Sequence, residues 1–261
     1  MIAGFAPSVR AQDSIPWPAA NRLSVKVSVE SLTTRGDTLR LWYSLGNSPG
    51  SEQAIQNFAV RTFVSQYRIE GPARWHASPG VVQDSAAVLW SAVFGRPVIP
   101  GARLSGFWFE GTGLPAVVPF RVQGSYEPPK YDDSLPWLFK QAPSFWANSV
   151  AGVTIGLVPL PSDHSTVALL ARLRTFADLA CGDVGWIAHA GTCRSLEASL
   201  EAAASSLAGG DVPAAKGRLE AFLSELAAQH GPQPGKHVSD DAYWLLKANA
   251  EYVLRQLAGK Q

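Results

Sequence analysis

The sequence carries little charge for its length. Only 16% of the 261 residues are Asp, Glu, Lys or Arg, and the formal net charge is +1, with no long run of either sign. Nucleic-acid binding draws on a concentrated basic surface that releases phosphate counterions. We therefore expect no nucleic-acid partner. The sequence also lacks an apolar run of about 20 residues, the length that spans a bilayer, so no membrane span is expected.

Cysteine is scarce as well. Cys181 and Cys193 are the two cysteines, and they do not form a C-x-x-C redox pair. Two cysteines cannot complete a tetrahedral zinc site; His189 offers a third ligand, but the segment offers no fourth. We predict a disulfide between Cys181 and Cys193, which is typical of proteins in oxidising compartments. No metal and no cofactor are expected.

Motifs of the common active sites are missing. The sequence contains no G-x-S-x-G elbow, no G-x-x-x-x-G-K-[ST] loop and no G-x-G-x-x-G fingerprint. His76, with Asp84 eight residues later, and the pair Asp132-Asp133 remain as the basis of an alternative hypothesis, a hydrolase with an atypical site. The absence of an organised set of partners favours a noncatalytic protein over that alternative.

Tryptophan and proline are abundant, with nine and 19 residues respectively. Together with the low charge, they favour an exported, β-rich protein over a cytosolic enzyme. The start of the chain, MIAGFAPSVRA before Gln12, resembles the tail of a signal peptide, so residues 1–20 are interpreted as a residual signal peptide or disordered start. The expected location is secreted, periplasmic or on the cell surface.

Residues 21–125 follow the two-residue period of half-buried strands. Leu23, Val25, Val27 and Val29 alternate with polar residues, and further alternating runs follow between turns rich in Gly, Pro and Asn. The strands are expected at residues 23–29, 39–45, 57–64, 67–70, 88–93, 104–109 and 116–122, with Ser78-Pro79-Gly80 among the turns. About seven short strands in about 100 residues predict an antiparallel β-sandwich.

This region resembles the immunoglobulin-like sandwich of uncharacterised exported bacterial proteins. The residues that carry the resemblance are Tyr43-Ser44-Leu45-Gly46-Asn47-Ser48, Gly71-Pro72-Ala73-Arg74-Trp75, Ile99-Pro100-Gly101, Leu104-Ser105-Gly106-Phe107 and Gly113-Leu114-Pro115. The resemblance implies no catalytic residues. Because residues 21–125 contain no cysteine, the intersheet disulfide of antibody domains is excluded.

Residues 126–161 form a connector rich in proline and aromatic residues. Its apolar side chains, among them Trp137, Phe139, Phe145 and Trp146, predict that it packs along the sandwich, because a flexible linker would be rich in Gly and Ser. Residues 153–158 within it have the composition of one short strand.

After Pro161 the apolar residues take a helical period, and residues 162–261 predict a four-helix antiparallel bundle. The expected N-caps are Ser162 or Ser165, then Thr192, Asp211 and Ser239. Gly182 is expected to end the first helix, and Gly209-Gly210 the second. The fold class is thus α+β with two segregated domains, each expected to enclose its own apolar interior.

The helical region resembles the FIMAH domain, a module appended to exported bacterial proteins. The resemblance covers residues 165–258 and is carried by Leu196, Leu200, Gly210, Leu219-Glu220-Ala221-Phe222-Leu223, Val238-Ser239-Asp240-Asp241-Ala242-Tyr243, Leu246 and Ala250. It implies an accessory module and no reaction.

Two tryptophans are expected to point away from the sandwich core. If Leu41, Tyr43, Phe107 and Phe109 face inward, Trp42 and Trp108 face outward, since neighbouring side chains of a strand alternate. Exposed tryptophans need either a cover, from the connector or the bundle, or a ligand. We favour the cover; the alternative is a carbohydrate-binding surface formed by Trp42 and Trp108, with Trp75.

The sequence therefore predicts an exported, noncatalytic structural or recognition protein with a helical accessory module. Its expected partner is a polysaccharide or a cell-surface protein. Carbohydrate binding and an atypical hydrolase are the two alternatives.

Overall fold

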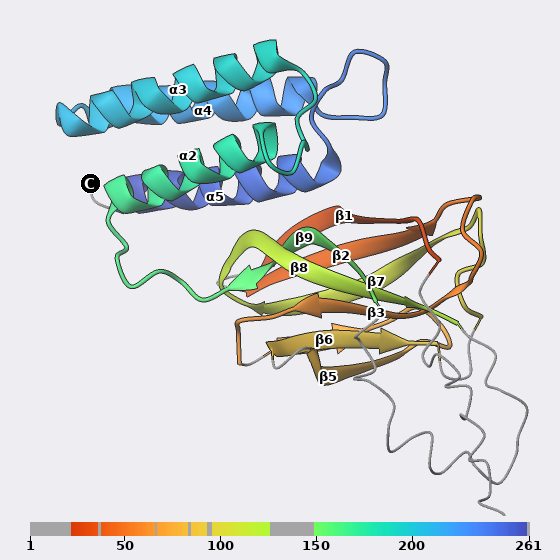
Figure 1. Ribbon diagram of the computed structural model, residues 1–261. Helices are drawn as coiled ribbons and strands as arrows, with labels where there is room; N and C mark the ends of the chain where they lie inside the picture. The colour runs from red at the N-terminus through yellow and green to blue at the C-terminus, as the bar shows by residue number, and fades with distance from the viewer. Residues whose placement is uncertain are drawn as a thin grey trace, which may run out of the picture.

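The computed structural model describes residues 22–35, 38–65, 67–82, 85–92, 96–125 and 149–259. In these ranges, two antiparallel sheets are followed by four helices (Figure 1). The strands are β1 (Val25–Arg35), β2 (Thr38–Asn47), β3 (Ile55–Arg61), β4 (Tyr67–Glu70), β5 (His76–Val82), β6 (Ser85–Ser91), β7 (Arg103–Thr112), β8 (Leu114–Gly124) and β9 (Val150–Val158). The helices are α2 (Thr166–Cys181), α3 (Ala190–Ala208), α4 (Val212–Gln229) and α5 (Asp240–Ala258).

The two sheets face each other across an aromatic core. One sheet has the order β1-β2-β7-β4 and the other the order β5-β6-β3-β8-β9, which confirms the predicted antiparallel β-sandwich. Phe58 lies at the centre of the core, stacked on Trp90 with ring centroids 5.0 Å apart and edge-on to Phe107 at 5.6 Å. The Tyr43 hydroxyl donates a hydrogen bond to the Ile155 carbonyl at 2.8 Å and so ties the two sheets together.

Two strands lie where the sequence indicates a turn and a connector. Ser78-Pro79-Gly80, predicted as a turn, lies in β5, which pairs with β6 and forms one edge of its sheet among the described strands. An edge strand tolerates Pro79 because one side of its backbone makes no ladder hydrogen bonds. β9, predicted as a short strand of the connector, is longer than expected and pairs with β8 as the other edge of that sheet.

The turn from β7 into β8 depends on Gly113. Its φ of 156° is one that L side chains rarely adopt, and an added Cβ would lie 2.3 Å from the Val158 carbonyl oxygen. Glycine therefore allows β8 to begin directly beside the end of β9.

The predicted bundle is present, and three of its N-caps are confirmed. The side chains of Ser165, Asp211 and Ser239 each accept a hydrogen bond from the backbone three residues on. The expectation that Thr192 caps α3 is wrong, because the helix begins earlier. Nδ1 of His189 accepts a hydrogen bond from the Thr192 backbone N–H at 3.2 Å, so His189 is the cap.

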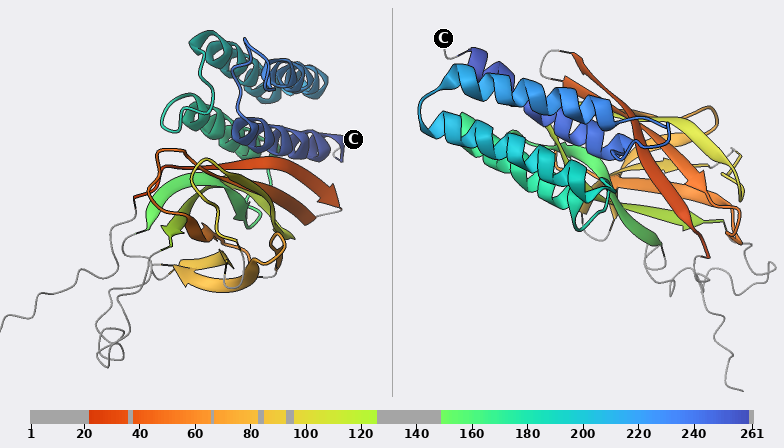
Figure 2. Two further views of the ribbon diagram at one scale, coloured as in Figure 1. Left: turned by 90° about the vertical axis from the view of Figure 1, so that its right-hand side faces the viewer. Right: turned by 90° about the horizontal axis from the view of Figure 1, so that it is seen from above.

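The helices stack on one side of the sandwich, at the edge formed by β1 and β9 (Figures 1 and 2). α2 and α5 lie nearest the strands, and α3 and α4 lie beyond them. A single hydrophobic cluster runs from sandwich residues such as Phe58 and Ile155 to bundle residues such as Leu246 and Leu219. The apolar interiors of the two halves are therefore in contact.

Polar side chains of α5 reinforce this junction. Asp241 accepts a hydrogen bond from the Val29 backbone N–H at 3.1 Å, and the Trp244 indole N–H donates to the Glu30 carbonyl at 3.2 Å. The Asn249 amide donates to the Pro115 carbonyl at 3.0 Å. α5 thus hydrogen-bonds to both β1 and β8.

None of the helices in the described ranges combines the length and apolar character needed to cross a membrane.

Candidate functional site

The outer face of the β1-β2-β7-β4 sheet carries a pair of aromatic side chains. Trp42 on β2 lies directly opposite Trp108 on β7, and their ring centroids are 6.0 Å apart with planes tilted by 48°. Leu41, Tyr43, Phe107 and Phe109, the neighbours of the two tryptophans in sequence, are fully buried. The two indoles therefore point away from the core and are only partly buried, as the alternation predicts.

An ion pair holds an arginine over these rings. Nε and Nη2 of Arg40 lie 2.8 and 2.6 Å from Oε2 of Glu110, its cross-strand partner. The same guanidinium stands 4.1 Å from the centroid of the Trp108 ring and 5.7 Å from that of Trp42. Arg40 is thus oriented by a carboxylate and a cation–π contact together, and it occupies one face of Trp108.

A polar network borders the pair on the side of β1. Glu30 accepts hydrogen bonds from Arg103 at 3.0 Å and from the Ser105 hydroxyl at 2.7 Å. Arg103 also donates to the Ser44 hydroxyl at 2.6 Å. The outer face therefore presents two aromatic rings within a frame of positioned donors and acceptors. This pattern is typical of a site that binds a ligand with apolar and polar faces.

Trp75, the third predicted binding residue, lies elsewhere. It is only 7% exposed, it contacts Phe107 edge-on at 5.0 Å, and its indole N–H donates to the Arg96 carbonyl at 3.3 Å. Trp75 is therefore a core residue between the sheets and not part of a surface platform.

The bundle contacts the sandwich mainly at strands other than those that carry Trp42 and Trp108. Contacts between helices and sandwich concentrate on β1, β8 and β9, whereas Trp42 and Trp108 lie on β2 and β7. Residues 126–148, which hold Trp137, Phe139, Phe145 and Trp146, lie outside the described residues.

Of the residues of the hydrolase hypothesis, the described ranges include His76 alone. His76 is exposed at the start of β5, and Asp84, Asp132 and Asp133 lie outside the described ranges. Those ranges contain no group of three or more His, Cys, Asp or Glu side chains placed to hold a metal ion.

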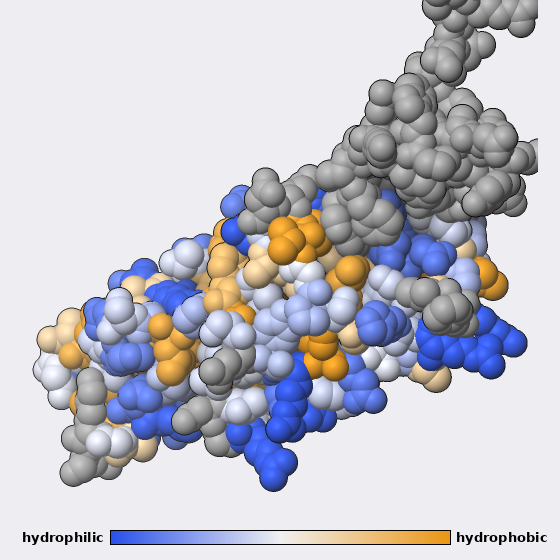
Figure 3. Space-filling model, turned by 90° about the horizontal axis from the view of Figure 1, so that it is seen from below, coloured by the Kyte–Doolittle hydropathy of each residue, from blue (hydrophilic) through white to orange (hydrophobic). Residues whose placement is uncertain are grey.

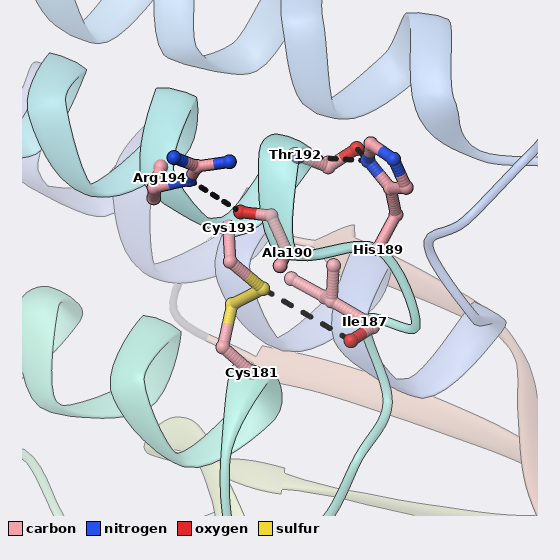
Figure 4. The surroundings of a disulfide bond; sticks show 7 residues. All are labelled: Cys181, Ile187, His189, Ala190, Thr192, Cys193 and Arg194. Carbon is pink, nitrogen blue, oxygen red and sulfur yellow. Dashed lines mark hydrogen bonds between the residues drawn. A yellow bond between two sulfur atoms is a disulfide. The ribbon is translucent and has the colours of Figure 1, made fainter.

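The predicted disulfide is confirmed (Figure 4). It joins Cys181, the last residue of α2, to Cys193 in the first turn of α3, with Cα atoms 5.8 Å apart. His189 and Thr192, whose hydrogen bond caps α3, lie beside it (Figure 4). The bond fastens one helix to the next at the turn between them.

Apolar side chains do not gather into one dominant patch on the side of the sandwich opposite the bundle. Figure 3 shows them there as separate spots among polar residues, where described residues are visible. The large exposed apolar side chains of the described ranges are likewise spread over strands, loops and a helix; they are Phe63, Val81, Ile99, Val153, Leu160 and Val167. The Trp42–Trp108 pair is therefore the stronger candidate for a recognition surface.

Comparison with known proteins finds one family model and solved structures that are similar to parts of this chain. The model of the FIMAH domain matches residues 181–255, which begin at the last residue of α2, include α3 and α4, and end in the last turn of α5. A solved structure of an uncharacterised protein from Nocardia farcinica, described as having an immunoglobulin-like fold, is 17% identical. The match covers 51% of this chain and 97% of that one, with a TM-score of 0.30. Since that score is low, the sandwich is defined by its own strand pairing. No curated protein sequence matches this chain.

Sequence reasoning singled out the two tryptophans but missed the Arg40–Glu110 pair. The signal was present in the alternation, because Arg40 and Trp42, like Trp108 and Glu110, are two residues apart and share a face. What was missing was the register that places Arg40 opposite Glu110.

Proposed function

We propose that this protein is an exported, noncatalytic recognition protein that binds a polysaccharide on the outer face of the β1-β2-β7-β4 sheet. The observation that carries the proposal is the Trp42–Trp108 pair, which lies outside the hydrophobic core and within a polar frame. The helical region acts as an accessory module that fixes one edge of the sandwich.

The chemistry of the surface suits a sugar. The C–H face of a pyranose packs against an aromatic ring, and its hydroxyls need hydrogen-bond donors and acceptors around that ring. Trp42 supplies the less obstructed ring, since Arg40 stands closer to Trp108. Arg103 and Ser105, on the strand of Trp108, and Glu30 on β1 supply polar groups.

Export is supported by the cysteine chemistry. Both cysteines form one disulfide, and such bonds persist in oxidising environments, whereas cytosolic thiols are kept reduced. The resemblance of the chain's first residues to a signal peptide points the same way, although they lie outside the described residues.

Retention on soluble and insoluble polysaccharides tests the proposal. We expect the wild-type protein to be retained on at least one polysaccharide and Trp42→Ala to weaken that binding about tenfold, as removal of a central aromatic contact does. Phe63→Ala is the matched control, because Phe63 is 45% exposed and also lies under an arginine, Arg61, at 4.5 Å.

The proposal fails if no polysaccharide retains the wild-type protein. It also fails if Trp42→Ala and Trp108→Ala bind as tightly as wild type. Either result would favour a structural role for the sandwich over polysaccharide binding.

A further inference from the structure

We infer that the Trp42–Trp108 surface recognises an acidic polysaccharide, with Arg35 and Arg68 binding carboxylates of its uronic-acid units. The inference rests on the proposed function and names the class of sugar. Its basis is a basic hollow that adjoins the tryptophan pair on the same face of the same sheet.

Strand register places the hollow beside the aromatic rings. Arg40, Glu110 and Arg68 form one cross-strand row over β2, β7 and β4, next to the row that contains Trp42 and Trp108. Residues two apart on a strand lie about 7 Å apart, so the two rows are neighbours on the outer face. A chain of sugars can therefore contact both rows at once.

The hollow has room for a ligand group. It has a volume of about 470 Å³ and is open to solvent. Arg35, Thr38, Tyr67, Arg68, Glu110 and Thr112 are among the residues that line it. The hydroxyl side chains of Thr38 and Thr112 can exchange hydrogen bonds with sugar hydroxyls.

Positive charge is in excess in this hollow. Glu110 is its acidic lining residue, and its carboxylate is already engaged by Arg40. Arg35 and Arg68 are exposed, and neither has an acidic partner within the described ranges. Glu70, the acidic residue of β4, lies opposite Trp108 in the aromatic row, two residues from Arg68 on the same face, and it does not line the hollow.

The arginines determine the chemical class of the ligand. A guanidinium presents paired N–H donors that match a carboxylate or a sulfate and is weakly hydrated, so it binds such groups even on a surface. Arg68 lies one cross-strand row from the indoles, and Arg35, opposite Thr38, lies two rows away. The pair is therefore complementary to a polymer that carries anionic groups along a run of ring faces. A uronate unit has this combination, whereas a neutral sugar leaves the arginines unused.

Binding of the full chain to polygalacturonate and to its methyl ester provides the test, because the two share one backbone and differ in charge. At low ionic strength, about 0.05 M, we expect polygalacturonate to bind about tenfold more tightly than the ester. The double variant R35Q/R68Q should lose this preference. The control R218Q removes an exposed arginine of α4 and should keep it.

The outcomes separate the inference from the proposed function. If both polymers bind equally and Trp42→Ala weakens both, the recognition surface stands and the acidic preference is overturned. The preference is also overturned if poly-glutamate competes as well as polygalacturonate, or if only dextran sulfate binds, because the ligand is then a peptide or a sulfate. If no polysaccharide binds, the proposed function falls with it.

Discussion

Asp241 is a buried acidic residue at the contact between the sandwich and the bundle. Asp241 lies on α5 and is only 5% exposed. Its carboxylate accepts hydrogen bonds from the Val29 N–H at 3.1 Å and from the Thr154 hydroxyl at 3.5 Å. Burial raises the pKa of this carboxyl to about 7, and the nearby negative charge of Asp240 adds to the shift. The hydrogen bonds and Lys26 oppose it in part.

Asp241 predicts that the protein becomes less stable as pH rises towards neutrality. Its pKa is about 7 in the folded chain and near 3.8 when unfolded, so the folded state binds the proton more tightly. The resulting stabilisation is full below the unfolded pKa and is lost as pH rises through the folded pKa. Asp241→Asn, which is neutral throughout, should therefore be more stabilising relative to wild type at about pH 8 than at about pH 5, as measured by urea unfolding.

Asp183→Asn is the matched control for Asp241→Asn, since Asp183 is exposed in the turn after α2. Its stability relative to wild type should change little between the two pH values. A stability difference for Asp241→Asn that is the same at both would contradict the assignment.

At the scale of elements, α5 protects the edge strand β1. An edge strand exposes backbone N–H and carbonyl groups that can pair with another chain. β1 has a bulge at Glu30, where its register with β2 shifts, and α5 bonds to the backbone on either side of that point. Asp241 takes the Val29 N–H and Trp244 the Glu30 carbonyl, so the helix replaces a neighbouring strand.

A disulfide, Cys181–Cys193, links α2 to α3. The disulfide closes a loop with a sequence separation of 12 between its cysteines. Closing a loop of this size restricts the unfolded chain and stabilises the fold by about 2–3 kcal/mol. The double variant C181S/C193S should lose about that much free energy of unfolding, measured by urea denaturation without reductant.

Two alkylatable thiols in wild-type protein from an oxidising compartment would contradict the disulfide. So would a free energy of unfolding of C181S/C193S equal to that of the wild type, both measured without reductant. One linked peptide containing both cysteines is the expected mass-spectrometric result.

For the molecule as a whole, the contiguous core predicts that sandwich and bundle unfold together. α5 buries apolar side chains such as Leu245 and Leu246 completely, and the cluster to which they belong extends into both halves. Heating should therefore give one transition, with the helical signal in far-UV circular dichroism and the aromatic signal in near-UV lost at the same temperature.

Leu219→Ala sharpens this test, because Leu219 is fully buried in α4, one of the two helices farther from the strands. The cavity should cost about 2–5 kcal/mol and lower both midpoints equally if the halves form one cooperative unit. Two separate transitions, with only the helical one shifted, would show that the halves unfold independently.

Patterns of neighbouring residues were enough to predict the four helices, most of the strands and many of their ends. The alternation around Trp42 and Trp108 predicts which side chains leave the core, because the direction of a side chain in a strand depends only on its place in the alternation. Ser165, Asp211 and Ser239 were correctly identified as caps for a similar reason, since capping is a contact within four residues.

Contacts between distant segments could not be predicted from the sequence. Pro79 resembles a turn residue until β5 is known to be an edge, and β9 resembles part of a linker until β8 is known to lie beside it. The burial of Trp75 against Phe107, the pairing of Arg40 with Glu110 and the contact of Asp241 with Val29 each join residues far apart in the chain. The local spacing of apolar residues does not identify such partners, because the packing of the whole chain decides which surfaces meet.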